Sequence, residues 1–162
     1  MISPTYGEVS MSRVAELIYE FVHRLGDYRT YHVTVGTDSQ NFDKTKVVNV
    51  IAVHCEGKGG IFFYQIRKVP LIRNVKQKLT EETSCSLELA QELLDAMDAF
   101  AEERGWDYHK NLTFAIHVDA GPNGKSSRSI PSVTAWVRAC GWSVETKPNS
   151  YAASSIANKY SK

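Results

Sequence analysis

The sequence has no excess of charge of either sign, few cysteines and no long apolar run. Its 19 lysine and arginine residues are matched by 18 aspartate and glutamate residues, so net charge alone predicts neither a strongly basic nucleic-acid-binding protein nor an acidic tail. The three cysteines, Cys55, Cys85 and Cys140, lack the paired C-x-x-C spacing of zinc sites, and we expect reduced thiols in a cytoplasmic protein. No apolar stretch is long enough for a signal peptide or a membrane span, so no membrane partner is expected.

Hydrophobic periodicity predicts alternating helices and strands within one domain, residues 1–162. Apolar residues at helical spacing predict helices over residues 10–25, 79–104, 129–139 and 150–160. Runs rich in β-branched and aromatic residues predict strands over residues 31–37, 46–54, 61–69, 111–119 and 141–146. This order is a three-strand meander followed by two crossover units, which predicts an α/β fold with a five-stranded mixed sheet and helices on both faces.

Two aspartates, Asp38 and Asp119, come at the ends of predicted apolar strands. Ligands of open α/β sheets collect at strand ends near a switch in topology, so the two carboxylates are candidates to converge. Each aspartate alone is also typical of an Asx-turn, in which the side chain bonds the backbone two residues on.

Several segments together resemble the ribonuclease H-like family, most closely its bacterial YkuK-type branch, a predicted nuclease group. They are "GTDSQ" after the first long strand, the acidic central helix, "HVDAGPNGKS" after the fourth strand, the opening "ISPTYGEVS" and the closing "KPNSYAASSIANKYSK". The resemblance implies the five-stranded sheet of the ribonuclease H-like fold, to which the helix predicted over residues 10–25 is an extra N-terminal element. It also implies a carboxylate cluster that holds Mg²⁺ or Mn²⁺ for phosphodiester hydrolysis of the two-metal type, and these hard ions prefer oxygen ligands.

A third carboxylate is expected from the central helix, and two glutamates compete for the role. Glu82 lies on the stripe of that helix that faces the sheet, whereas Glu88 falls nearly opposite it. However, "TSCSLEL" resembles the segment around the helix glutamate of ribonuclease H itself, so Glu88 stays an alternative. Glu82 would otherwise only complement the positive end of the helix dipole.

The last predicted helix has no acidic residue, although this fold usually supplies a fourth acid there. The resemblance places Asn158 where that acid is expected. An amide oxygen can ligate a metal but adds no charge, so a second ion is expected to bind weakly.

Two segments are candidates for contact with nucleic-acid phosphates. "GPNGKS" fails as a P-loop because Asp119 stands where that motif needs glycine, but the turn still offers Lys125, Ser126 and Arg128 to a phosphate. "RKVPLIRNVKQK" carries Arg73 and Lys76 within a stretch without acids. Ordinary solvent-exposed loops would explain both segments equally well.

We therefore expect a metal-dependent nuclease with Asp38, Glu82 and Asp119 as ligands and a metal-activated water as nucleophile. Its partner would be RNA, an RNA/DNA hybrid or DNA. Two alternatives remain. The first is a catalytically weakened module that binds nucleic acid. The second is a small phosphotransferase, because nucleotide kinases share this fold, although a single domain of this length lacks their second lobe. His32 and His117 lie on the same strand faces as the aspartates, either as neighbours of the site or as core residues.

Overall fold

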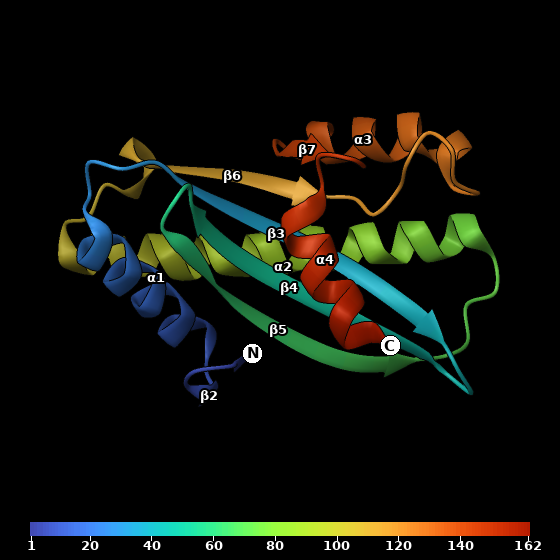
Figure 1. Ribbon diagram of the computed structural model, residues 1–162, viewed down its shortest axis with the longest axis horizontal. Coiled ribbons are helices and arrows are strands. Elements are labelled where there is room, and N and C mark those ends of the chain that lie inside the picture. The colour runs from blue at the N-terminus through green and yellow to red at the C-terminus, as the bar shows by residue number, and fades with distance from the viewer.

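The computed structural model describes the backbone of residues 1–162 and all side chains except those of residues 151–154. It has one seven-stranded mixed sheet with helices on both faces (Figure 1). The elements in chain order are β1 (Ile2–Ser3), β2 (Gly7–Glu8), α1 (Met11–Leu25), β3 (Tyr31–Asn41), β4 (Thr45–Cys55), β5 (Gly59–Val69), α2 (Val75–Arg104), the 3₁₀ turn η1 (Tyr108–Lys110), β6 (Leu112–His117), the 3₁₀ turn η2 (Ser127–Ser129), α3 (Ile130–Ala139), β7 (Ser143–Glu145) and α4 (Tyr151–Ser161).

The strand order is β2-β1-β5-β4-β3-β6-β7. Strands β3, β4 and β5 form an antiparallel meander, and β6 and β7 add to it in parallel, so the predicted meander with two crossover strands is confirmed. The predicted count of five strands is wrong by two, because β1 and β2 extend the sheet beyond β5. Each has only two residues, too few for a period-two pattern to be visible in sequence.

Helices α1 and α2 cover one face of the sheet and α4 crosses the other; in Figure 1, α4 lies in front of β3 and β4 while α2 runs behind them. The main core lies on the α1 and α2 face, where alternate strand residues such as Val33 and Val35 are buried. A smaller apolar cluster under α4 joins Val48 and Val50 to Ala157. None of the helices described is both long and apolar enough to pass through a bilayer.

Capping side chains set where the two longest helices begin. The backbone N–H of Arg13 donates to the hydroxyl of Ser10 at 3.1 Å, as the predicted start of α1 requires. The N–H of Gln77 donates to the side-chain oxygen of Asn74 at 2.9 Å, so α2 begins at Val75, before the predicted residue 79. Gly105 ends α2 in the left-handed conformation, with φ of 66°.

Strand β3 continues past Asp38, which corrects the prediction that Asp38 ends a strand. The ladder with β4 runs through Asp38↔Val48 to Asn41↔Thr45, whereas the parallel ladder with β6 stops at Gly36↔His117. Backbone hydrogen bonds hold the antiparallel ladder whatever the side chains, so polar residues do not end it. Asp38 therefore lies on a part of β3 that is paired on one side only.

Candidate active site

Asp38 and Asp119 come from adjacent parallel strands and lie at the same edge of the sheet. Each is two residues beyond Gly36↔His117, the last pair of the β3–β6 ladder. Because neighbouring strands lie about 4.8 Å apart, this register brings the two carboxylates close together. Asp38 is buried, with 7% of its surface exposed, and the side chain of Asp119 is 19% exposed.

Glu82 approaches the same region from the opposite face of the sheet. The hydroxyl of Ser39 on β3 donates to Glu82 Oε1 at 2.5 Å, and one helical turn later Ser86 shares a 2.7 Å hydrogen bond with Thr37. One turn of helix matches two residues of strand in length, so α2 and β3 meet at two successive positions. Glu82 is buried in this contact.

Glu88, the alternative to Glu82, is exposed on the far side of α2. Its carboxylate accepts a hydrogen bond of 3.3 Å from Ser84 on the same helix. The structure thus places Asp38, Glu82 and Asp119 close enough for their charges to interact and leaves Glu88 in solvent. Whether these residues ligate metal stays a prediction.

Burial and mutual repulsion raise the pKa of the two buried carboxyls, Asp38 and Glu82. Burial raises the pKa of Asp38, against the hydrogen bond from Ser161, and the charge of Asp119 raises it further. Burial raises the pKa of Glu82 to about 8, the hydrogen bond from Ser39 opposes this, and the charges of Asp38 and Asp119 add to it. The three carboxyls are therefore close enough for their charges to act on one another, and a cation bound among them would be stabilised.

Lys147, which sequence reasoning missed, forms an ion pair with one of these carboxyls. Its Nζ lies 2.8 Å from Asp119 Oδ1, and this hydrogen bond is the main cause of the raised pKa of Lys147. The charges of Asp38 and Glu82 raise that pKa further. The side chain is 56% exposed, so Lys147 reaches the carboxylates from the rim. No motif marks this lysine in the sequence; it follows β7, and its backbone N–H donates to the carbonyl of Ala120.

Helix α4 contacts Asp38 through Ser161, a second residue that sequence reasoning missed. The Ser161 hydroxyl is buried and donates to Asp38 Oδ2 at 2.7 Å. Asn158, the predicted ligand of this helix, has an exposed side chain, and its carbonyl accepts a 3.1 Å hydrogen bond from Ser161. The predicted helix ended at residue 160, one short of Ser161, although Ser161 follows the buried Ala157 by four residues and shares its face.

The donor chemistry of the site fits a hard divalent cation, because its three carboxyls are oxygen donors under mutual repulsion. Their present arrangement is not that of a closed metal site. Among the described residues, no three His, Cys, Asp or Glu side chains are grouped so that they could hold one ion. Asp119 pairs with Lys147, and Glu82 accepts from Ser39. Joint ligation would require Lys147 to leave Asp119.

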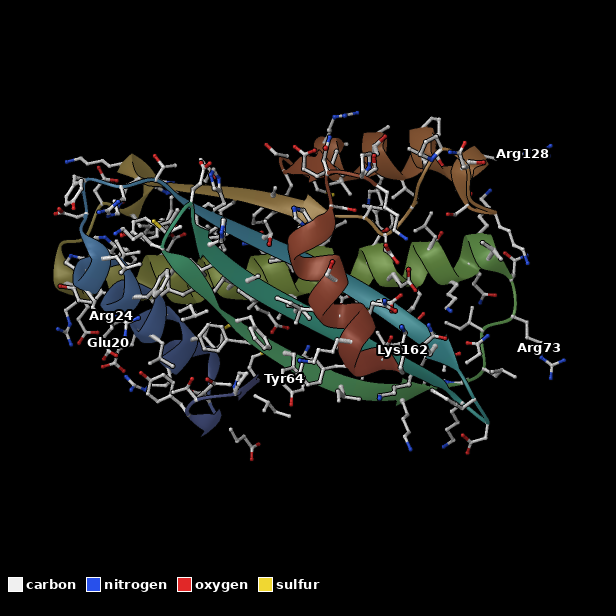
Figure 2. The ribbon with its side chains drawn as sticks, in the orientation of Figure 1. Glu20, Arg24, Tyr64, Arg73, Arg128 and Lys162 are labelled. Carbon is white, nitrogen blue, oxygen red and sulfur yellow. The ribbon has the colours of Figure 1, made fainter. Side chains whose placement is uncertain are left out.

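Two of the candidate phosphate contacts, Arg73 and Arg128, lie at the same end of the molecule. Figure 2 shows Arg73 and Arg128 projecting from the end where α2 begins, although they are far apart in sequence. Lys76 and Lys125 are exposed as well, and Ser126 is half-buried. Some backbone N–H groups of the turn are already used inside it: the N–H groups of residues 124, 127 and 129 donate to the carbonyls of residues 121, 124 and 126. Phosphate binding there would rest mainly on the side chains.

His32 and His117 lie on the face of the sheet that α4 crosses. His32 is exposed, and its Nδ1 lies 2.8 Å from the hydroxyl of Thr113. His117 is buried, and burial lowers its pKa to about 4, so the imidazole is neutral at pH 7. Neither ring contacts a carboxylate in the hydrogen bonds described.

Comparison with known proteins gives a family model, a curated relative and a solved structure. The family model is described as "Ribonuclease H-like" and matches residues 13–162. The relative is a Bacillus subtilis (strain 168) protein named "Uncharacterized protein YkuK", 31% identical over 166 residues that cover 96% of this chain and 92% of that protein. The solved structure is the catalytic domain of Mos1 transposase with raltegravir and Mg. It is 12% identical, and the match covers 85% of this chain and 62% of that one. Its TM-score of 0.30 is too low to support an inference about the site. On the strength of the family model and the YkuK relative, the chain belongs to the ribonuclease H-like family, in its YkuK-type branch.

Proposed function

We propose that this protein is a divalent-metal-dependent nuclease that hydrolyses phosphodiester bonds of nucleic acid, by chemistry of the two-metal type. The observation that carries the proposal is that Asp38, Glu82 and Asp119, from β3, α2 and the end of β6, lie close enough for their charges to interact. Burying carboxyls at this density costs stability, and proteins tolerate such costs mostly at functional sites. In a ribonuclease H-like chain, the function that fits is the binding of Mg²⁺ or Mn²⁺.

Each residue of the site has a distinct proposed part in this function. Asp38, Glu82 and Asp119 would hold the cation, with the amide of Asn158 as a weaker, uncharged addition. A bound divalent cation supplies neutralisation of the phosphate and a lowered pKa for a water molecule. Ser39 and Ser161 fix the orientation of the carboxyls by donating to them.

The basic residues would bind the substrate backbone. Arg73 and Arg128 project from the end of the molecule where α2 begins, Lys76 and Lys125 are exposed as well, and Ser126 adds a hydroxyl. Lys78, on the first turns of α2, is close enough for its charge to lower the pKa of Asp38 and Glu82. Positive charge therefore continues from this end of the molecule to the carboxylates, as a phosphate backbone entering the site would require.

A catalytically weakened nucleic-acid-binding module is the second candidate. Two observations favour it: Lys147 already pairs with Asp119, and α4 has no acidic residue in its sequence. A phosphotransferase is not favoured by any contact of the site. The three cysteines are free in the structure, in accord with the proposal of a cytoplasmic protein.

The test of the nuclease proposal is metal binding by the wild type and three single variants. Mn²⁺ should raise the melting temperature of the wild type by mass action on the folded state, and Asp38→Asn should abolish this rise. Glu82→Gln should reduce the rise, and the matched control Glu88→Gln on the same helix should keep it. Cleavage of a labelled oligonucleotide, measured in parallel, should follow the same order.

The outcomes separate the candidate functions. An Mn²⁺ response that survives Asp38→Asn would overturn the site assignment. A larger effect of Glu88→Gln than of Glu82→Gln would show that the ligand comes from the other face of α2. Metal and oligonucleotide binding without any cleavage would favour the weakened module.

A further inference from the structure

A cavity of about 450 Å³ lies on the face of the sheet that α4 only partly covers. In Figure 1, α4 crosses the sheet at the end of β6, and no described helix lies in front of the rest of β6 and the neighbouring parts of β3 and β4. The polar side chains that line the cavity include His32, Thr34, His54, His117, Glu145 and Asn149.

Strand register gathers these side chains on one face. His32 is paired with His54 across the antiparallel ladder and with Thr113 across the parallel one. Thr34 and His117 follow on the same face because side chains on one face of a strand recur every second residue. His117 is paired with Glu145 on β7. Four neighbouring strands thus present histidine, hydroxyl and carboxylate groups to one space.

Two buried polar atoms of the lining lack a hydrogen-bond partner in the described structure. They are Oγ1 of Thr34, whose residue is 7% exposed, and Nδ1 of His117, whose residue is 5% exposed. Buried polar atoms are nearly always paired, because an unpaired one has lost its water without gaining a partner. Two such atoms beside one cavity indicate a site for a hydrogen-bonding ligand.

The charge of the lining decides the class of that ligand. No lysine or arginine lines the cavity, and its single carboxylate, Glu145, is exposed, so the cavity does not suit a phosphate. A neutral, planar group with several donors and acceptors fits imidazole, hydroxyl and amide partners better. The volume lies within the range of small-molecule sites.

The position of the cavity links this ligand to the carboxylate site. His117 precedes Asp119 by two residues, and Thr34 precedes Asp38 by four on the same strand face. We propose that the cavity is a nucleobase subsite, which receives one unpaired base of the nucleic-acid substrate while the adjacent phosphate lies at the carboxylates. This proposal rests on the proposed nuclease function and narrows it to substrates with an unstacked base next to the phosphate that is cut.

A base can enter such a cavity only when it is free of its complementary strand. The wild type should therefore bind a single-stranded oligonucleotide more tightly than the same sequence in a duplex. A base held on side chains contributes about five- to 150-fold in affinity, so one abasic nucleotide at the subsite should weaken binding about tenfold.

The experiment fills the cavity without removing any polar group. Ala115 lines the cavity on β6, and Ala115→Leu places a larger side chain in that space. Ala99→Leu is the matched control, because Ala99 is exposed on α2, on the far side of the sheet. Oligonucleotide affinity is measured with and without an abasic nucleotide, in EDTA so that metal does not contribute. The melting temperature of each variant verifies that it is folded.

Ala115→Leu should abolish the preference for the base-bearing strand, and Ala99→Leu should retain it. Adenosine or uridine alone, added to the wild type, should shift the NMR signals of the His32, His54 and His117 rings, and Asp38→Asn should keep these shifts. Absence of ring shifts at millimolar nucleoside, or a base preference that survives Ala115→Leu, would overturn the subsite. Loss of the Mn²⁺ response, with nucleoside binding intact, would instead refute the nuclease function alone.

Discussion

Glu82→Gln should make the protein more stable at neutral pH. Burial raises the pKa of Glu82 from 4.5 to about 8, so between these values the folded state holds a proton that the unfolded state has lost. Stability then falls as pH rises, by about 1.4 kcal/mol per pH unit. Between pH 4.5 and pH 7 the loss amounts to about 3 kcal/mol, and glutamine, which has no such proton to bind, avoids it.

The substitution keeps the local structure, which makes the comparison clean. The side-chain oxygen of glutamine still accepts the hydrogen bond that Ser39 donates to Glu82 Oε1. The difference in the free energy of unfolding between variant and wild type should be small near pH 4.5. It should grow to about 3 kcal/mol at pH 7 and stop growing above pH 8.

Urea unfolding at pH 5, 6, 7 and 8, without divalent metal, measures this difference directly. Glu88→Gln is the control, because it makes the same chemical change on the same helix at an exposed position, without the burial that acts on Glu82. Parallel pH profiles for the wild type and Glu82→Gln would refute the reasoning, since they would mean that Glu82 ionises alike in the folded and unfolded states.

Three further predictions concern the cations and the missing acid of the site. Lys147→Met should tighten Mn²⁺ binding in calorimetric titration, because the substitution frees Asp119 from its ion pair, and weaker Mn²⁺ binding would contradict this. The same substitution should hardly change the free energy of unfolding, since exposed ion pairs contribute only about 0–1 kcal/mol. Asn158→Asp should raise Mn²⁺ affinity and phosphodiesterase turnover by adding a carboxylate, and no gain in either would remove Asn158 from the site. Replacing Arg73 and Lys76 by alanine should lower the slope of log affinity against log salt by about two, measured by fluorescence anisotropy; an unchanged slope would mean that neither residue contacts a phosphate.

The fold was predictable from sequence wherever an element is long enough to show a period. The apolar stripe of α1 and the alternation of β3, β4 and β5 identify those elements, and their order identifies the sheet. The two-residue strands β1 and β2 were missed, because pairing at the edge of β5, not their own pattern, makes them strands. The start of α2 was placed too late because the cap at Asn74 lies ahead of the apolar stripe.

Within the site, the choice between the two helix glutamates could be made from helical periodicity, whereas the tertiary contacts of the site could not be predicted. Helical spacing places Glu82 toward the sheet and Glu88 away from it, and in the structure Glu82 is buried and Glu88 is exposed. Lys147 and Ser161 could not be found in this way, because each meets its carboxylate through tertiary contacts across long sequence separations: Ser161 lies 123 residues from Asp38. Local patterns carry no signal of such pairings.

Lys147 and the protonated Glu82 together decide how the site should take up a metal ion. With its pKa raised to about 8, Glu82 is mostly neutral at pH 7, and Asp119 forms an ion pair with Lys147. A divalent cation that uses all three carboxyls must ionise Glu82 and displace Lys147. Metal uptake should therefore release up to one proton, and affinity should rise with pH to about pH 8 and then level off. Calorimetric titration with Mn²⁺ in buffers of different ionisation enthalpy counts the protons released. Release from the wild type but not from Glu82→Gln would identify Glu82 as their source, whereas equal release from both proteins would place the titrating group elsewhere.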